Sequence, residues 1–247
     1  MLGHFSPLTK RTSTHLKNRM NSTTKTSISE PEMKVNQHTA VSGSKCLLVP
    51  YEAHHVPKYH TWMQDPAILA ATASDQLTLE EELENQQSWR ESSDKLTFIV
   101  CQPVSPADDA AVKAGVCDAP DKMIGDVNLF LYPHEDDEDA YVGEVDIMIA
   151  EHRCRGVGLG KAVVALFLTY VHRNVDAILR EYNQGTAELK TLMAKINKDN
   201  AASIALFRSL GFEQEGEANY FGEVKLVMHD WRGRFDTDYQ EKRYTPL

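Results

Sequence analysis

The sequence predicts an α/β fold of the α+β kind, with a mixed, mostly antiparallel central sheet of about seven strands flanked by helices. Residues 123–132 and 141–150 alternate between apolar and polar side chains, and the short connection between them predicts an antiparallel hairpin. A glycine-rich loop, an apolar helix and another strand follow at residues 151–196, an order that predicts a parallel strand pair with a right-handed crossover. We therefore expect a mixed sheet.

Four segments come before this hairpin. An apolar run at residues 45–51 predicts the first strand, and the apolar spacing after it predicts a helix that ends or bends at the Asp-Pro pair 65–66. A capping box predicts a helix over residues 79–90, and a β-branched and aromatic run predicts a strand over 95–101. Residues 102–121 hold three prolines and show no periodicity, so we expect a mobile surface insertion.

Helix and strand alternate after the glycine loop. The first helix is extended or followed by polar residues, and Asn200 is a good N-cap for a second helix that Gly211 ends in the left-handed conformation. The expected elements are a helix at 159–173, a strand at 188–196, a helix at 200–210, and strands at 212–217 and 223–229. The domain is thus expected at residues 45–229, with residues 1–44 as an extension and 230–247 as a loose charged tail.

Composition limits the classes of function. The chain has 247 residues, 42% of them hydrophobic, which is enough for one sizeable core. Its net charge of -10 opposes nonspecific nucleic-acid binding, which depends on neutralising phosphates. No apolar stretch approaches the roughly 18–20 residues of a membrane span. The four cysteines form no CxxC pair and have no histidines at zinc spacing, so we expect reduced thiols and no metal.

The N-terminal segment has a composition of its own. Residues 1–32 are rich in serine and threonine, and residues 1–29 carry five basic and no acidic side chains. This is compatible with a mitochondrial transit peptide, but a disordered extension is the simpler interpretation because no amphipathic arginine-rich helix is evident. Met33 is an alternative start.

The glycine loop is the clearest functional signal. Gly156, Gly158 and Gly160 lie between a strand and a helix, where free backbone N–H groups form an anion site. A tight turn without a ligand is the alternative. A dinucleotide site is disfavoured, because Gly160 follows Gly158 by only two residues and four expected strands precede the loop. Three cations flank the loop: Arg153, Arg155 and Lys161.

Two motifs resemble those of a known family. "RCRGVGLGKAVV", following "GEVDIMIA", resembles the acetyl-CoA pyrophosphate loop of the GNAT superfamily of acetyltransferases, in a variant R-G-x-G-L-G. "NKDNAASIALFRSLGF" resembles the second cofactor segment of the same superfamily. Further stretches, such as "MKVNQHTA" and "LVPYEAHHVPKYHTWMQDP", resemble the eukaryotic N-acetyltransferase 9-like branch, whose chains begin near the residue matching Met33. The resemblance covers residues 45–229 and implies a GNAT-like fold.

This resemblance implies acetyl-CoA as co-substrate, with no metal. The backbone before the loop would pair with the pantetheine arm, the loop would hold the pyrophosphate, and the second segment would contact the arm. Helix capping by Asn200 and packing of Ser203 are the alternatives for those two side chains. The implied cofactor-binding residues are Ile147, Met148, Ile149, Arg155, Gly156, Val157, Gly158, Leu159, Gly160, Lys161, Asn197, Asn200 and Ser203.

Acetyl transfer to an amine also needs a proton acceptor and a donor for the leaving thiolate. Glu144 and Asp146 share one face of their strand, and the resemblance favours Glu144 as base, with Asp126 a weaker candidate. Phenylalanine stands at position 207, where many members of the superfamily carry a tyrosine, so Tyr220 is the candidate acid and release of the thiolate into water without an acid is the alternative. A solvated carboxylate without a catalytic role is the alternative for Glu144.

The acceptor is expected to be a protein N-terminal amine. The N-acetyltransferase 9-like branch is linked to the N-termini of α- and β-tubulin, which begin Met-Arg, and the acidic residues 135–139 suit a basic substrate end. A solvated hairpin tip is the alternative for this segment. There are two alternative functions. The protein could acetylate another protein or a small-molecule amine, or it could be a non-catalytic microtubule-associated module that keeps the fold. We expect a cytoplasmic, microtubule-associated protein, or a mitochondrial one if residues 1–32 act in targeting.

Overall fold

The computed structural model describes residues 34–105, 111–183, 187–235 and 237–247. From Lys34 to Leu247 the chain forms one compact unit. Of the predicted extension at residues 1–44, residues 1–33 lie outside the described part of the chain. The domain therefore includes residues ahead of the predicted boundary at residue 45.

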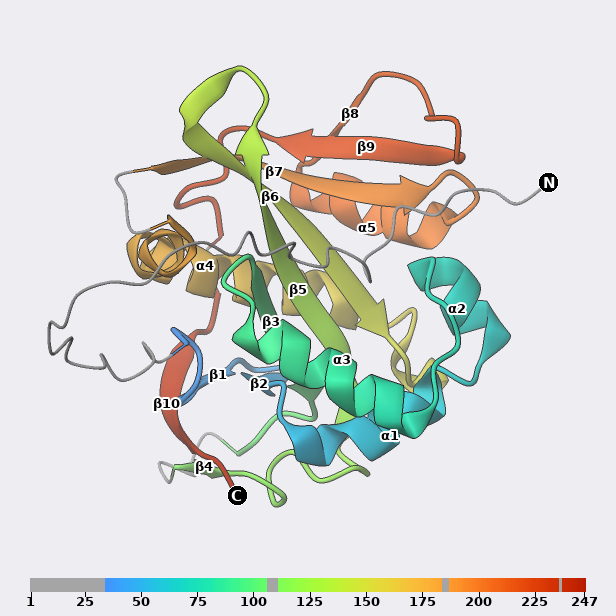
Figure 1. Ribbon diagram of the computed structural model, residues 1–247, viewed down its shortest axis with the longest axis vertical. Helices are drawn as coiled ribbons and strands as arrows, with labels where there is room; N and C mark the ends of the chain where they lie inside the picture. The colour runs from blue at the N-terminus through green and yellow to red at the C-terminus, as the bar shows by residue number, and fades with distance from the viewer. Residues whose placement is uncertain (1–33, 106–110, 184–186, 236) are drawn as a thin grey trace, which may run out of the picture. The chain divides into compact units, whose positions relative to one another are not determined.

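In the described part of the unit, two strands, three helices and four strands come first, and helix and strand alternate only over residues 159–215 (Figure 1). The helices are α1 (Val56–Trp62), α2 (Pro66–Thr72), α3 (Leu79–Glu91), α4 (Leu159–Asn183) and α5 (Ala201–Leu210), with short 3-10 turns η1 (Ala53–His55) and η2 (His152–Cys154). The strands are β1 (Thr39–Ser42), β2 (Leu47–Pro50), β3 (Lys95–Cys101), β4 (Val112–Lys113), β5 (Met123–His134), β6 (Asp137–Ile149), β7 (Glu188–Asn197), β8 (Glu213–Glu215), β9 (Glu223–Met228) and β10 (Gln240–Thr245).

One mixed sheet contains all these strands, in the order β4-β10-β1-β2-β3-β5-β6-β7-β9-β8. The β6–β7 and β4–β10 pairs are parallel and the others are antiparallel. The predicted fold class, the β5–β6 hairpin and the parallel β6–β7 crossover are confirmed. The seven predicted strands correspond to β2, β3 and β5–β9, and β1, β4 and β10 were not expected.

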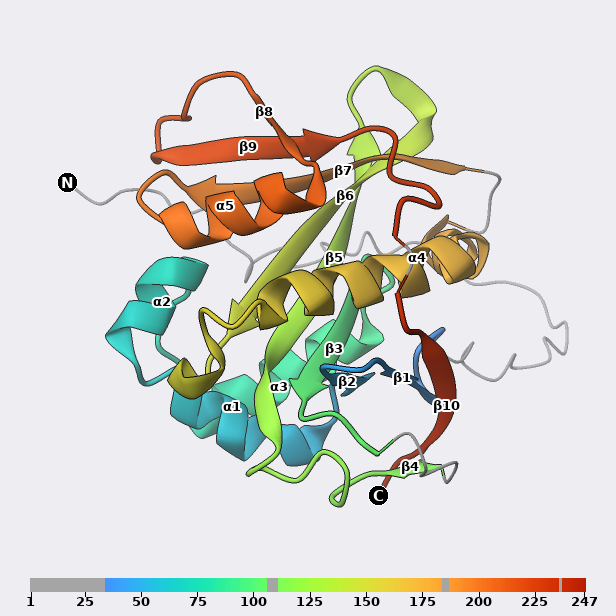
Figure 2. The same cartoon turned by 180° about the vertical axis from the view of Figure 1, so that it is seen from behind.

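Helices cover both faces of the sheet. Figures 1 and 2 show α4 and α5 on one face and α1 and α3 on the other. The larger apolar core lies under α4 and includes Phe98, Phe167 and Tyr170, while a second cluster packs around α1. Helix α4 is the one described helix long and apolar enough to cross a membrane, but 61% of that apolar stretch is buried inside the domain. It is therefore the central core helix.

The predicted loose tail from residue 230 is wrong. Trp231 is 1% exposed and its indole N–H donates to the Leu189 carbonyl, while Tyr244 is fully buried in β10. Strand β10 pairs with β1, which lies within the predicted extension. Two aromatic anchors hold a segment in which half of the other side chains are charged, and this charge made the segment look unstructured.

The predicted mobile insertion is also partly ordered. Its β4 pairs in parallel with β10, and Asp118 is fully buried. Residues 106–110 of this insertion lie outside the described part. Helix α2 was missed because an Asp-Pro pair was taken as a helix end, whereas Asp65 is the N-cap and accepts a hydrogen bond from the Ala67 amide.

Candidate active site

The sheet opens between β6 and β7. Their parallel pairing ends at Glu144 and Met193, while β6 continues to Ile149 and stays paired with β5 on its other side. In the opened stretch the Ile147 amide donates to the Asp146 carboxylate at 2.8 Å instead of to a neighbouring strand. Among the described residues, the Ile147–Ile149 edge therefore lacks a partner strand on this side, and its pairing with the pantetheine arm stays a prediction.

The glycine loop continues from the end of β6 into α4. Gly156 and Gly158 have φ angles of 73° and 75°, which favour glycine, and added Cβ atoms there meet open space or only the Lys45 ammonium at 3.9 Å. The backbone N–H groups of residues 156–161 have no acceptor among the described residues. These free amides at the positive end of a long helix form an anion site.

The other loop residues have structural partners. Arg155 donates from Nε to the Ile149 carbonyl at 2.6 Å and from Nη2 to the Ala150 carbonyl at 3.1 Å. Lys161 donates to the Ser209 carbonyl at 2.9 Å. Both cations therefore brace the loop while adding positive charge beside it.

Gly160 serves helix packing. A Cβ at this position would lie 2.5 Å from Leu206 Cδ1. This glycine therefore allows α4 and α5 to approach closely. Its surroundings favour a role in helix packing over a role in making room for a phosphate.

The second predicted segment lies at the end of β7 and the start of α5. Asn200 is the N-cap of α5, its side-chain oxygen accepting from the Ser203 amide at 3.1 Å. Asn197 accepts from the Asp199 amide at 2.9 Å. The capping alternative for Asn200 is confirmed, and these bonds fix the turn beside the opened strands.

The predicted base, Glu144, is engaged. Its carboxylate accepts a hydrogen bond from the Lys195 ammonium at 2.9 Å, and this ammonium also lies 5.4 Å from the centre of the Tyr132 ring. Lys195 of β7 therefore holds the Glu144 carboxylate across the β6–β7 pair. Asp146, two residues further along β6, keeps part of its side chain exposed, and loss of the rest of its hydration together with the negative charge of Glu144 raises its pKa.

A second carboxyl group lies on the neighbouring strand. Asp126 of β5 is 3% exposed, accepts from the Asn128 amide at 3.1 Å, and accepts from the Tyr59 hydroxyl at 3.3 Å. Burial, and then the negative charge of Asp146, raise the pKa of Asp126 to about 7 against the lowering effect of these hydrogen bonds. The sequence signal for this group was an Asp and an Asn two residues apart in an otherwise apolar strand.

The predicted acid, Tyr220, is not held in the site. Its side chain is 95% exposed on the connection between β8 and β9, and its ring packs against Phe221. Phe207 is buried and packs against Phe212, so the position that often carries a tyrosine belongs to the core here.

Helix α1 is fastened to the start of the loop. The Glu151 carboxylate accepts from the Trp62 indole at 3.0 Å and pairs with the Lys58 ammonium at 2.7 Å. His152 lies 3.5 Å from Asp65, the N-cap of α2. The helices on one face of the sheet are therefore tied to the anion site.

Removing this tie is expected to weaken ligand binding at the loop. Glu151→Ala loses both contacts, and we expect a roughly tenfold higher Kd for CoA, since hydrogen bonds to charged groups contribute about 1.5–3 kcal/mol each. Glu151→Gln, which can still accept from Trp62, should lose less. Calorimetric titration of both variants measures the difference, and wild-type affinity in Glu151→Ala would contradict this role.

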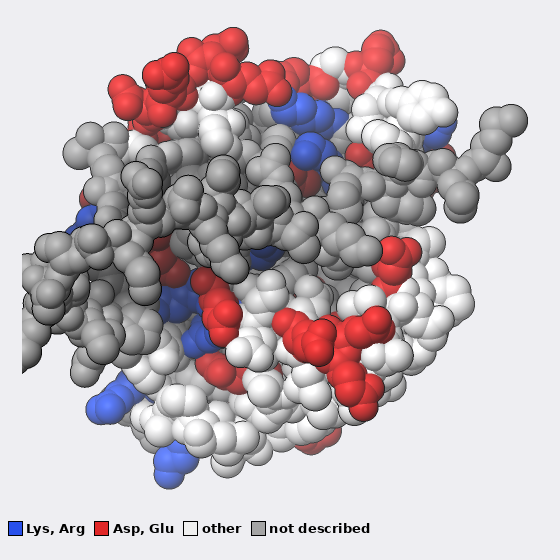
Figure 3. Space-filling view, in the orientation of Figure 1, with Lys and Arg blue, Asp and Glu red and all other residues white. Residues whose placement is uncertain are grey.

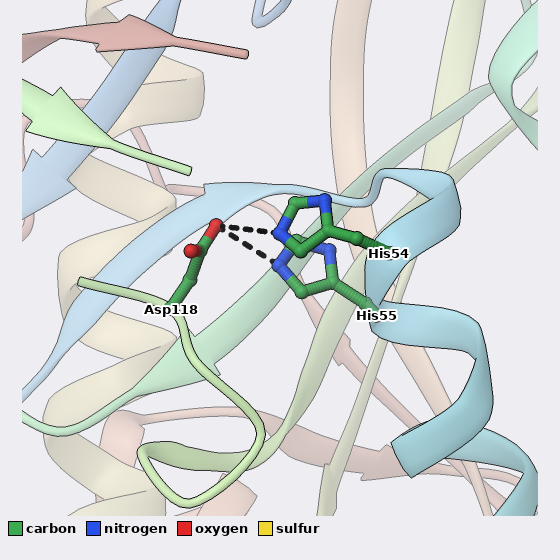
Figure 4. A group of neighbouring side chains, drawn as sticks. All are labelled: His54, His55 and Asp118. Carbon is green, nitrogen blue, oxygen red and sulfur yellow. Dashed lines mark hydrogen bonds and ion pairs between the residues drawn. The ribbon is translucent and has the colours of Figure 1, made fainter. Parts of the chain in front are cut away.

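A separate cluster joins η1 to the 102–121 segment (Figure 4). The Asp118 carboxylate faces the Nε2 atoms of His54 at 3.1 Å and His55 at 3.0 Å and accepts from the Tyr244 hydroxyl at 2.7 Å. These two histidines and Asp118 are close enough to hold a metal ion, a grouping that the sequence did not predict. However, the Glu52 amide donates to His55 Nδ1, so the His55 proton lies on Nε2 and points at Asp118. The cluster is therefore a hydrogen-bonded hub.

The fold and the opened strand pair beside a free-amide loop define the class of GNAT acetyltransferases. Residues 45–213 match the acetyltransferase (GNAT) domain family. The alpha/beta-tubulin-N-acetyltransferase 9 of Drosophila melanogaster is 42% identical over 203 residues, covering 81% of this chain and 92% of that protein. The human protein of the same name is 39% identical over 219 residues, covering 86% and 96%. The chain belongs to the N-acetyltransferase 9-like family of GNAT acetyltransferases.

Solved structures agree on the fold. A spermidine N-acetyltransferase from Vibrio cholerae, in complex with CoA and spermine, has a TM-score of 0.55 at 15% identity, covering 75% of this chain and 95% of that chain. The ribosomal L7/L12 alpha-N-protein acetyltransferase RimL, in complex with CoA, has a TM-score of 0.53 at 15% identity, covering 75% and 94%. At this identity the likeness concerns the fold alone.

Proposed function

We propose that this N-acetyltransferase transfers the acetyl group of acetyl-CoA to protein N-terminal amines, with the N-termini of α- and β-tubulin as substrates. The observation that carries the proposal is the free-amide loop beside the unpaired edge of β6. The names of the Drosophila and human relatives support the acceptor.

The described residues fit acetyl-CoA. The amides of residues 156–161 suit the pyrophosphate, Arg155 and Lys161 hold the loop in shape, and the Ile147–Ile149 edge suits the pantetheine arm. When bound, acetyl-CoA supplies the thioester whose carbonyl carbon the amine attacks. A backbone N–H at the opened edge would polarise that carbonyl.

Asp146 is the proposed proton acceptor. An α-amino group has an ordinary pKa of about 7.7–8.0, so a carboxylate with a raised pKa is a suitable partner. Asp146 has an exposed side chain at the opened edge, whereas Glu144 is paired with Lys195. Tyr220 remains a proposed acid only if the exposed connection folds toward the site.

The acidic hairpin tip is proposed to attract the basic second residue of the substrate. The β5–β6 hairpin projects beyond the sheet (Figure 1), and Figure 3 shows acidic side chains along that edge. Glu135, Asp136, Glu138 and Asp139 are exposed, while Asp137 pairs with Lys190 at 3.1 Å. A concentration of negative charge would favour association with Met-Arg starts.

Neutralising the four unpaired acids as Gln or Asn is expected to raise KM for a Met-Arg peptide about three- to tenfold at low salt, with kcat unchanged. Acetylation of N-terminal peptides by the full chain measures this. The matched control neutralises Glu80 and Glu84, which are exposed on α3. An unchanged KM in the hairpin variant would remove this role of the tip.

The same peptide panel tests the acceptor. Preference for Met-Arg starts supports tubulin, preference for other starts or for small amines favours another substrate, and no acetylation favours a non-catalytic module. A cytoplasmic, microtubule-associated location is part of this proposal, with mitochondrial import as the alternative. N-terminal sequencing of the native protein decides between starts at Met1 and Met33.

A further inference from the structure

A row of polar side chains crosses the sheet, from half-buried Thr97 through buried Asn128 to Asp146 at the exposed, opened edge. Thr97 of β3 lies opposite Asn128 of β5, which lies opposite Asp146 of β6, and Asp126 is two residues from Asn128 on the same face. The other side chains on these strands are mostly apolar. The row thus links the interior to the one place where β6 lacks a partner strand.

Three atoms of this row are buried without a hydrogen-bond partner: Thr97 Oγ1, Asp126 Oδ1 and Asn128 Oδ1. The Asn128 Oδ1 atom accepts only, as does Asp126 Oδ1 when Asp126 is ionised, whereas the Thr97 hydroxyl can also donate. A water molecule, with two donors and two acceptor sites, would satisfy all three, and buried waters occupy such places. Cross-strand and diagonal neighbours on one face are close enough for such bridging.

We propose that Asp126 is a proton-relay residue, receiving through this row the proton that Asp146 takes from the acceptor amine. The inference rests on the proposed acetyl transfer. Asp146 is exposed and Asp126 is buried behind it, so the proton moves away from the reacting nitrogen. The hydrogen bonds from Asn128 and Tyr59 hold the Asp126 carboxyl in place.

The step balances in protons and electrons. The acceptor ammonium gives one proton to Asp146, and its nitrogen then forms a bond to the acetyl carbonyl carbon. The carbon–sulfur bond breaks and its electron pair leaves on the CoA sulfur. The second nitrogen proton neutralises that sulfur as the thiol, and the proton stored on the carboxyl pair returns to water.

The charged and titratable groups around Asp126 come from four elements. Among the described residues, Tyr59 on α1, Tyr51 after β2 and Asp146 on β6 interact with Asp126 directly, while Glu82 on α3 acts on the two tyrosines and Glu144 on β6 acts on Asp146. The Lys195 ammonium nearby pairs with Glu144. No described cation therefore offsets the repulsion between the two aspartates, and they are expected to titrate as a coupled pair.

Two substitutions should move the pH profile in opposite directions. Tyr59→Phe removes a hydrogen bond to the carboxylate, so the rising limb of kcat/KM should move to higher pH by roughly half a unit. Asp126→Asn leaves Asp146 as a weaker base, so the limb should move to lower pH and kcat should fall about tenfold. Asp176→Asn, an exposed change on α4, is the control and should leave the profile unchanged.

Kinetics of the full chain with acetyl-CoA and its best N-terminal peptide give the profiles. Shifts in opposite directions support the relay, while an unmoved limb in either variant, or shifts in one direction, overturns it. Retained CoA binding shows that each variant folds. If no peptide is acetylated, the proposed function fails, but carbon-13 NMR titration of the carboxyl groups still tests the aspartate pair. The wild type should show one aspartate that titrates near pH 7, and its pKa should be higher in Tyr59→Phe. A wild type in which no aspartate titrates near pH 7 overturns the inference.

Discussion

Replacing Gly158 by aspartate is expected to abolish CoA binding while leaving the domain folded. An added Cβ at this position lies 3.9 Å from the Lys45 ammonium and meets nothing closer, so there is room for the side chain. The carboxylate would lie beside the free amides proposed to hold the pyrophosphate. Like charges about 4 Å apart repel by about 4 kcal/mol at an effective dielectric constant of 20, so we expect at least a hundredfold rise in Kd.

Gly158→Asn is the matched control for this change. It imposes the same side chain on a φ of 75° without adding charge. We therefore expect similar thermal stability for both variants but much weaker binding for the aspartate, as measured by calorimetric titration with CoA. Equal affinity in the two variants would contradict the placement of the pyrophosphate at this loop.

Local signals explain which parts of the fold were predictable. The β5–β6 hairpin and the glycine loop depend on alternation and on glycines within a few residues of one another. Strands β1 and β10 pair Thr39 with Arg243, across most of the chain, and each is short and partly polar. Pairing over such a distance depends on the assembled core, which a local pattern does not contain.

The site shows the same division. The free amides of the loop follow from its glycines, but the partners of Arg155 and Lys161 are backbone carbonyls that no residue type reveals. From the sequence, Glu144 looked free to act as a base. Its ion pair with Lys195 depends on the register of the β6–β7 pairing, which the sequence does not reveal. Residue type therefore predicted the anion site, whereas the state of each charged side chain depended on tertiary contacts.

Replacing Asp118 by alanine is expected to destabilise the domain by about 3–5 kcal/mol, the range for leaving buried partners of a charged group unpaired. One oxygen of this carboxylate faces His54, His55 and Tyr244, and the other accepts from the Gly115 amide at 2.6 Å. Burial alone would raise the pKa of Asp118, but the bonds from the histidines and the tyrosine hold it well below its usual range. The carboxylate is thus ionised and joins η1, the 102–121 segment and β10.

Tyr244→Phe is the graded comparison, because it removes one of these bonds and keeps the buried ring. We expect a loss of about 1.5–3 kcal/mol for this variant, the range for one hydrogen bond to a charged group, against the larger loss in Asp118→Ala. Urea denaturation at pH 7.5 measures both, with and without a chelator. Equal losses would contradict a hub centred on the carboxylate, and a chelator that destabilises the wild type would contradict the tautomer assigned to His55, since it would show a bound metal ion.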